Sequence, residues 1–96
     1  MVNSSRKERL EALVQNQFRP LHFELHDQSA QHAGHHGQPE NPSGTHFEML
    51  LVSDVFRGLS RLQRQKAVHE LLKAEFSSGL HALSMKLMSP EEWQAR

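Results

Sequence analysis

Histidine is the residue type with the clearest chemical potential in this sequence, because the chain has eight histidines and no cysteine. Imidazole nitrogens are good ligands for transition metals such as zinc and nickel. The absence of thiols excludes disulfides, thiolate zinc sites and thiol catalysis within the chain. Any chemistry of metal binding must therefore use imidazole, with carboxylates as the only other strong side-chain donors.

His81 stands in phase with Leu83 and Met85, two apolar residues of an alternating stretch. This alternation predicts a strand, with His81 at its start, half-buried and rigidly held. Partly buried histidines often serve only to bond a backbone carbonyl at the edge of a core. From the spacing alone, a core-edge role and a ligand role both remain open.

Three more histidines fall in the stretch His32-Ala33-Gly34-His35-His36. It lies within residues 27–45, which consist mostly of Gly, Pro, Ser, Asn, Gln and His and are predicted to form a flexible loop. The loop could be a solvated segment whose histidines do nothing, or it could capture zinc or nickel. No carboxylate stands at a spacing that specifies such a site.

A basic segment provides a second candidate site. Residues 57–76 carry a local excess of three positive charges, and four of the cations crowd a turn and a first helix, namely Arg57, Arg61, Arg64 and Lys66. Clustered cations can engage phosphates. The Gly-x-x-Gly loop of nucleic-acid-clamping KH domains is absent, since Gly58 is followed by Leu59-Ser60-Arg61. An ordinary solvated helix face is the alternative interpretation.

Other function classes find little support. No Ser-His-Asp arrangement, glycine-rich phosphate loop or paired-carboxylate signature is present. The carboxylates of Asp27 and Asp54 could join histidines in a hydrolytic site, but nothing orders them. The formal net charge is zero, and no window is apolar enough for a membrane helix. With no secretory signal at the start, we expect one cytoplasmic domain over residues 1–96.

Capping boxes and apolar spacing predict the elements that position these residues. Ser5 with Glu8 begins a helix that ends before Pro20, and Ser60 with Gln63 begins a helical region split into two helices. Ser89 begins a short last helix, in which we expect Trp93 to fold back on the core.

Three strands are predicted, over residues 21–25, 47–52 and 83–87. The second is densely apolar, which predicts burial largely on both faces and a central place in the sheet. The order is helix, strand, strand, helix, helix, strand, short helix. It predicts a two-layer α+β domain with helices on one face of the sheet.

That order, together with several local strings, resembles the BolA family. The strings cover nearly the whole chain, in order and at compatible spacing. They are Thr45-His46-Phe47, Val52-Ser53-Asp54-Val55-Phe56-Arg57-Gly58, Leu62-Gln63-Arg64, His81-Ala82-Leu83 and Ser89-Pro90-Glu91-Glu92-Trp93. One departure is Arg64-Gln65-Lys66, where many members read Arg-His-Arg.

The resemblance implies an αββααβ class II KH-like domain with a three-stranded mixed sheet, and no enzymatic activity. It implies pairing with a monothiol glutaredoxin through a shared [2Fe–2S] cluster in iron–sulfur homeostasis. It also makes His81 a cluster ligand and His32 the match to the family's loop histidine, with His35 and His36 as alternates. A second implied role is that of a DNA-binding transcriptional regulator of stress response and cell morphology.

The cysteine-free composition agrees with a shared cluster. A [2Fe–2S] cluster usually takes four ligands, mostly thiolates, although imidazoles replace thiolates on one iron in Rieske centres. This chain could supply imidazoles while the partner and glutathione supply thiolates. The isolated chain is therefore expected to be monomeric and to hold no cluster.

Overall fold

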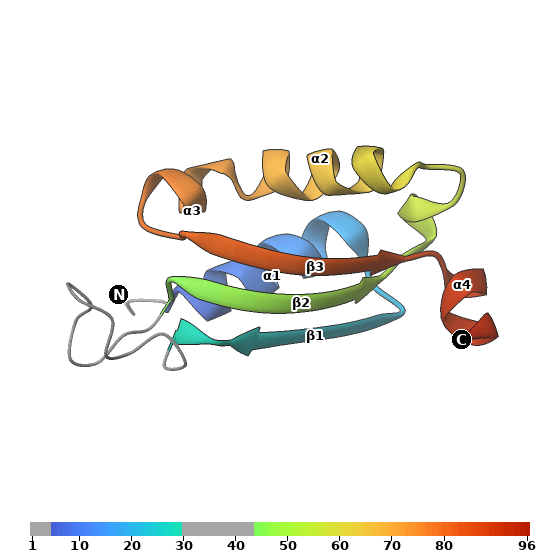
Figure 1. Cartoon of the computed structure of the whole chain (residues 1–96), viewed down its shortest axis with the longest axis horizontal. Coiled ribbons are helices and arrows are strands. Elements are labelled where there is room, and N and C mark those ends of the chain that lie inside the picture. The colour runs from blue at the N-terminus through green and yellow to red at the C-terminus, as the bar shows by residue number, and fades with distance from the viewer. Residues whose placement is uncertain (1–4, 30–43) are drawn as a thin grey trace.

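The computed structural model describes residues 5–29 and 44–96. Its elements follow the predicted order (Figure 1). They are α1 (Arg6–Phe18), β1 (His22–Asp27), β2 (His46–Val52), a 3-10 turn η2 (Asp54–Phe56), α2 (Arg61–Leu71), α3 (Lys73–Ser77), β3 (Ala82–Met88) and α4 (Pro90–Ala95).

The sheet is mixed, with β2 in the centre, antiparallel to β1 and parallel to β3. Figure 1 shows α2 and α3 running along β3, α1 behind the strands and α4 beyond one end of the sheet. The predicted α+β architecture is thus confirmed. No helix in the described ranges is long and apolar enough to cross a membrane.

Both predicted capping boxes form, at Ser5 and Ser60, and the predicted N-cap Ser89 forms a third. In each, a serine hydroxyl accepts a hydrogen bond from the N3 backbone N–H, and the N3 side chain accepts one from the serine N–H. The cap residues are Ser5, Ser60 and Ser89. These local bonds begin α1, α2 and α4 at the residues that the sequence predicts.

The core lies between the helices and one face of the sheet. Alternate residues of β2 point into it and are buried, whereas Glu48 on the opposite face is exposed and Leu50 is half-buried. Leu10, Val14 and Phe18 of α1 pack against this face. The prediction that β2 is central is confirmed, but burial on both of its faces was wrong, because no element of the described residues forms a second layer on the outer face.

Trp93 also departs from expectation. Its ring stacks on His22 of β1, with the ring centroids 4.6 Å apart, rather than joining the buried cluster. The Ser89 cap fixes the start of α4, which lies beyond one end of the sheet, and from there Trp93 reaches His22 of β1.

Candidate functional site

The base of the predicted loop is held by one buried hydroxyl. Ser29 has no exposed surface, and its Oγ accepts hydrogen bonds from the backbone N–H of Thr45 at 3.0 Å and of His46 at 3.1 Å. It also contacts the Thr45 hydroxyl at 3.1 Å. The two chain segments that flank residues 30–43 therefore lie side by side.

The carboxylate of Asp27 also holds the loop base. It accepts from the backbone N–H of Ser29 at 2.9 Å and of Gly44 at 3.0 Å. Burial raises the pKa of Asp27, but the hydrogen bonds from Ser29 and Gly44 outweigh it and hold the pKa below its usual value. At the two ends of the predicted 27–45 loop, Asp27 belongs to β1, and residues 29, 44 and 45 are hydrogen-bonded.

His81 lies beside this base. Its backbone N–H donates to the Thr45 carbonyl at 2.8 Å, and the preceding Leu80 is buried in the core. The backbone is thus held, as predicted, but the residue precedes β3 and is exposed rather than half-buried. The buried anchor is Leu80, one position earlier, and this leaves the imidazole accessible to a ligand or partner.

His46 is the nearest histidine to His81 among those described. The two imidazole rings are stacked with centroids 6.0 Å apart. His46 is half-buried, and its Nδ1 is 3.0 Å from the Thr45 hydroxyl, which in turn contacts Ser29. His46 therefore bonds near the point where the chain returns to the sheet.

The loop histidines His32, His35 and His36 lie outside the described residues. Within residues 5–29 and 44–96, no group of three or more His, Cys, Asp or Glu side chains is arranged to hold a metal ion. Near the loop base this part of the chain offers two imidazoles, those of His46 and His81, besides the Asp27 carboxylate, which already accepts two backbone hydrogen bonds. Such a donor set fits a share in a cluster completed by thiolates from another molecule, and it does not fit a whole ligand set.

The basic residues of the second candidate site are dispersed by the fold. Arg57 pairs with Asp54 at 2.5 Å and with Glu91 at 2.6 Å. Lys66 lies on another surface of α2, next to His69 and Lys73. Of the four predicted cations, two line one groove, Arg61 and Arg64.

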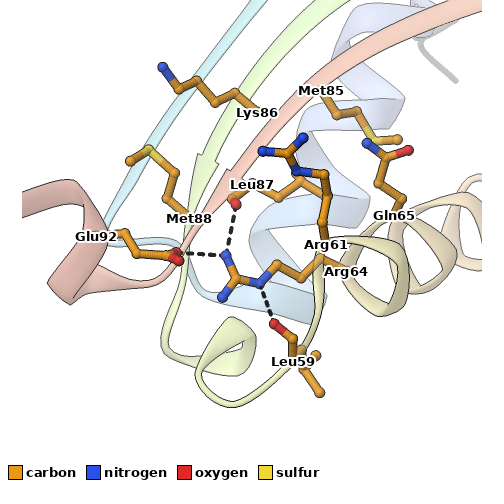
Figure 2. A pocket seen from close by; sticks show the side chains of 9 residues that line it. All are labelled: Leu59, Arg61, Arg64, Gln65, Met85, Lys86, Leu87, Met88 and Glu92. Atoms are coloured by element: carbon orange, nitrogen blue, oxygen red, sulfur yellow. Dashed lines mark hydrogen bonds and ion pairs between the residues drawn. The ribbon is translucent and has the colours of Figure 1, made fainter. Parts of the chain in front are cut away.

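That groove runs between α2 and β3 and is floored by Met85 and Leu87 (Figure 2). Arg64 is only 12% exposed, and its guanidinium donates to the Leu59 and Leu87 carbonyls at 3.0 Å each. It also pairs with Glu92 at 2.6 Å, which lowers the pKa of Glu92 to about 2. Arg64 therefore joins α2 to β3 and α4, whereas Arg61 is exposed.

Lys86 is a groove residue that sequence reasoning missed. It lies on β3, in the alternate phase to the apolar residues of that strand, and Figure 2 shows it at the same groove as Arg61. Its alternation with Met85 and Leu87 was visible in the sequence. That Lys86 lines the same groove as Arg61 could not be predicted, because it depends on how α2 lies against the strand.

Comparison with known proteins gives consistent matches. The family model described as BolA-like protein matches residues 14–92. SufE-like protein 1, chloroplastic/mitochondrial, from Arabidopsis thaliana is 38% identical over 92% of this chain, which spans only 24% of that protein. The DNA-binding transcriptional regulator BolA of Haemophilus influenzae is 31% identical over 91% of this chain and 80% of its own length.

Among solved structures, BolA1 from Arabidopsis thaliana is 35% identical and superposes with a TM-score of 0.84, covering 95% of this chain and 98% of that one. The family match, the relatives and this superposition all extend across β1, β2, α2 and β3. The chain therefore belongs to the BolA family, a non-enzymatic family.

Proposed function

We propose that this chain is a regulatory adaptor that binds a monothiol glutaredoxin through a shared [2Fe–2S] cluster, in iron–sulfur homeostasis. His81 and one loop histidine, His32 or its alternates His35 and His36, are the ligands from this chain. The partner and glutathione supply thiolates. A cluster held in this way would link the two proteins, with imidazole ligation on this side raising its potential relative to an all-thiolate cluster.

One observation carries the proposal. The backbone of His81 is held on Thr45, and Thr45 is held by Ser29 at the base of the histidine-containing loop. Because this backbone is already fixed, coordination orders only the side chain of His81, which limits the conformational entropy that is lost. Ser29 and Gly44, which flank residues 30–43, lie at the same end of the sheet as His81. Ligands from the loop are therefore attached close to His81.

The test is reconstitution with a monothiol glutaredoxin that carries a cluster, under anaerobic conditions and with glutathione. We expect a heterocomplex by native mass spectrometry and a visible circular dichroism spectrum different from that of the glutaredoxin alone. Failure to form a complex, or a cluster spectrum that the chain leaves unaltered, would contradict the proposal.

A second candidate function is DNA binding in the groove of Figure 2. The observation that favours it is that two exposed cations, Arg61 of α2 and Lys86 of β3, line one groove together with the apolar Met85 and Leu87. Such cations can contact phosphates while apolar side chains contact bases or sugars. The similarity to a DNA-binding transcriptional regulator agrees with this candidate.

Measuring DNA binding at several salt concentrations tests whether DNA binds in this groove. Arg61→Ala or Lys86→Ala should each weaken affinity and reduce the slope of log K against log salt by about one unit. Lys73→Ala is the matched control, because Lys73 is an exposed lysine outside the groove. Equal effects from the three substitutions would show that binding is diffuse and not located in the groove.

A further inference from the structure

Arg6, the first residue of α1, reaches across the molecule to the segment that precedes His81. Its Nη1 donates to the Glu75 carbonyl at 3.1 Å, to the Glu75 carboxylate at 2.7 Å and to the Ser78 hydroxyl at 3.0 Å. Its Nη2 donates to the Ser78 carbonyl at 3.1 Å. The side chain is only 14% exposed. A single guanidinium thus fixes the backbone at the end of α3 through two carbonyls.

Two glycines bring further backbone against Arg6. A methyl group built at Gly79 would lie 2.8 Å from Nη2, and one built at Gly44 would lie 3.2 Å from the Arg6 Cβ. Both glycines have positive φ, +131° and +74°. Arg6 therefore contacts the backbone two residues before His81 and, on the other side, the residue at which the loop returns to the sheet.

Backbone hydrogen bonds connect the segment that Arg6 holds to His81. The Glu75 carbonyl that accepts from Arg6 also accepts from the Leu80 N–H at 3.0 Å. The next N–H, that of His81, donates to Thr45, which follows Gly44. Arg6 thus bonds one of the two segments that meet at the candidate site and packs against the other.

The placement of Arg6 also carries a cost. Its Nε is buried and has no hydrogen-bond partner among the described residues. A buried donor without a partner is unfavourable, so part of the stabilisation from the four other hydrogen bonds of Arg6 is offset. Glu75 is meanwhile bonded by Arg9, whose Nε donates at 2.9 Å. The charge of Glu75 is therefore compensated even without Arg6.

We infer that Arg6 is a positioning residue for the cluster site: it sets the geometry of His81 relative to the loop base. The inference rests on the proposed function for the role of His81 as a ligand. An arginine is needed because its planar fork donates to several acceptors at once, which a lysine ammonium on a flexible stem does not reproduce.

The first test uses the free protein and needs no cluster. In Arg6→Ala we expect amide hydrogen exchange at Leu80, His81 and Thr45 to accelerate about tenfold or more relative to amides of α2. Arg64→Ala is the matched control, because Arg64 is equally buried and also binds two backbone carbonyls, but at the opposite end of β3. Unchanged exchange at His81, or equal acceleration in both variants, would overturn the inference.

The second test uses the glutaredoxin complex. Arg6→Ala should shorten the cluster lifetime about tenfold, in the range seen when a residue that orients a ligand is removed, and Arg6→Lys should recover part of it. Arg64→Ala should leave the lifetime unchanged. Should Arg6→Ala fail to fold, Arg6→Lys and Ser78→Ala, which each remove part of the same bonding, take its place in both tests.

His81→Ala, measured in parallel, separates the positioning role of Arg6 from the proposed function. If it destroys the cluster while a folded Arg6 variant leaves the lifetime unaltered, the positioning role is wrong and the proposed function stands. If it leaves the cluster unaltered, the assignment of His81 as a ligand in the proposed function fails, and exchange at His81 still decides whether Arg6 positions that residue.

Discussion

The buried hydroxyl of Ser29 accepts a hydrogen bond from the backbone N–H of Thr45 at 3.0 Å, across the base of the loop. Thr45 in turn accepts from the N–H of His81 through its carbonyl. One side chain before the loop thereby fixes the backbone against which the candidate ligand rests, so that the loop base and the start of β3 form a single unit.

Ser29→Ala should destabilise the free protein by about 1–3 kcal/mol, because it leaves the partly buried N–H groups of Thr45 and His46 without their acceptor. The free energy of unfolding, measured in urea, tests this. Ser84→Ala is the control, since Ser84 is an exposed serine of β3 and should change stability by less than about 0.5 kcal/mol. A similar small change for both serines would show that the Ser29 hydroxyl does not hold the loop base.

Arg64→Ala should act on stability and not on DNA. The substitution removes donors from two backbone carbonyls and from Glu92, so we expect a loss of about 1–3 kcal/mol in the free energy of unfolding. The salt slope of any DNA binding should stay near that of the wild type, unlike that of Arg61→Ala. A reduced slope with unchanged stability would instead assign Arg64 to phosphate contact, as the sequence alone suggested.

Acid should weaken the fold by breaking the ion pair between Arg64 and Glu92. Arg64 holds the pKa of Glu92 at about 2, below its usual 4.5. A carboxyl whose pKa is lowered by folding stabilises the native state above its unfolded pKa, and that contribution is lost as the pH falls from about 4.5 towards 2. Urea midpoints measured across this interval should fall less steeply in Arg64→Ala than in the wild type. Parallel curves would show that the pair adds no pH-dependent stability.

The fold was predictable because its determinants are local. The caps at Ser5, Ser60 and Ser89 each use residues three apart, and the strands follow from alternation. The roles of Arg64 and Glu75 were not predictable, since the partners that join them to β3, α4 and α1 lie between 23 and 69 residues away in sequence. A basic residue looks the same in a sequence whether it faces phosphate or bonds a distant carbonyl.

The candidate site was predicted only in part, because some of its determinants are local and others join distant residues. Phase with Leu83 and Met85 located His81 at the start of the last strand but overstated its burial, because the residue precedes the ladder and the core anchor is Leu80. The hydroxyl of Ser29 left no signal in the sequence, since a serine beside a polar loop is ordinary. Its importance comes from burial against Thr45, which only the folded chain shows.

The isolated chain should be colourless and monomeric. With no cysteine and with imidazoles as its donors at the candidate site, it lacks the thiolates that a [2Fe–2S] cluster needs. Anaerobic purification without partner or glutathione, followed by iron and sulfide analysis, checks this. Stoichiometric iron and sulfide in the pure chain would show that it completes a cluster by itself.

His81→Ala should damage the cluster of the glutaredoxin complex more than any single loop substitution. The backbone of His81 is fixed by its bond to Thr45, and no other described histidine but His46 lies beside it, whereas the loop holds three histidines close in sequence. A neighbour can replace a lost loop ligand, so His32→Ala should weaken the cluster only partly, with rescue by His35 or His36. Removing all three should match the His81 defect.

Visible circular dichroism and cluster lifetime are the measurements, and His69→Ala is the control, because His69 is an exposed histidine on α2 that stacks on Phe76 away from the loop base. Far-ultraviolet circular dichroism of the free variants should stay unchanged, since the exposed His81 ring is not part of the core. A cluster spectrum and lifetime unaltered by His81→Ala would remove His81 from the ligand set. If His46→Ala then abolished the spectrum, the ligand would be the neighbouring imidazole on β2, and the loop base would still be the site.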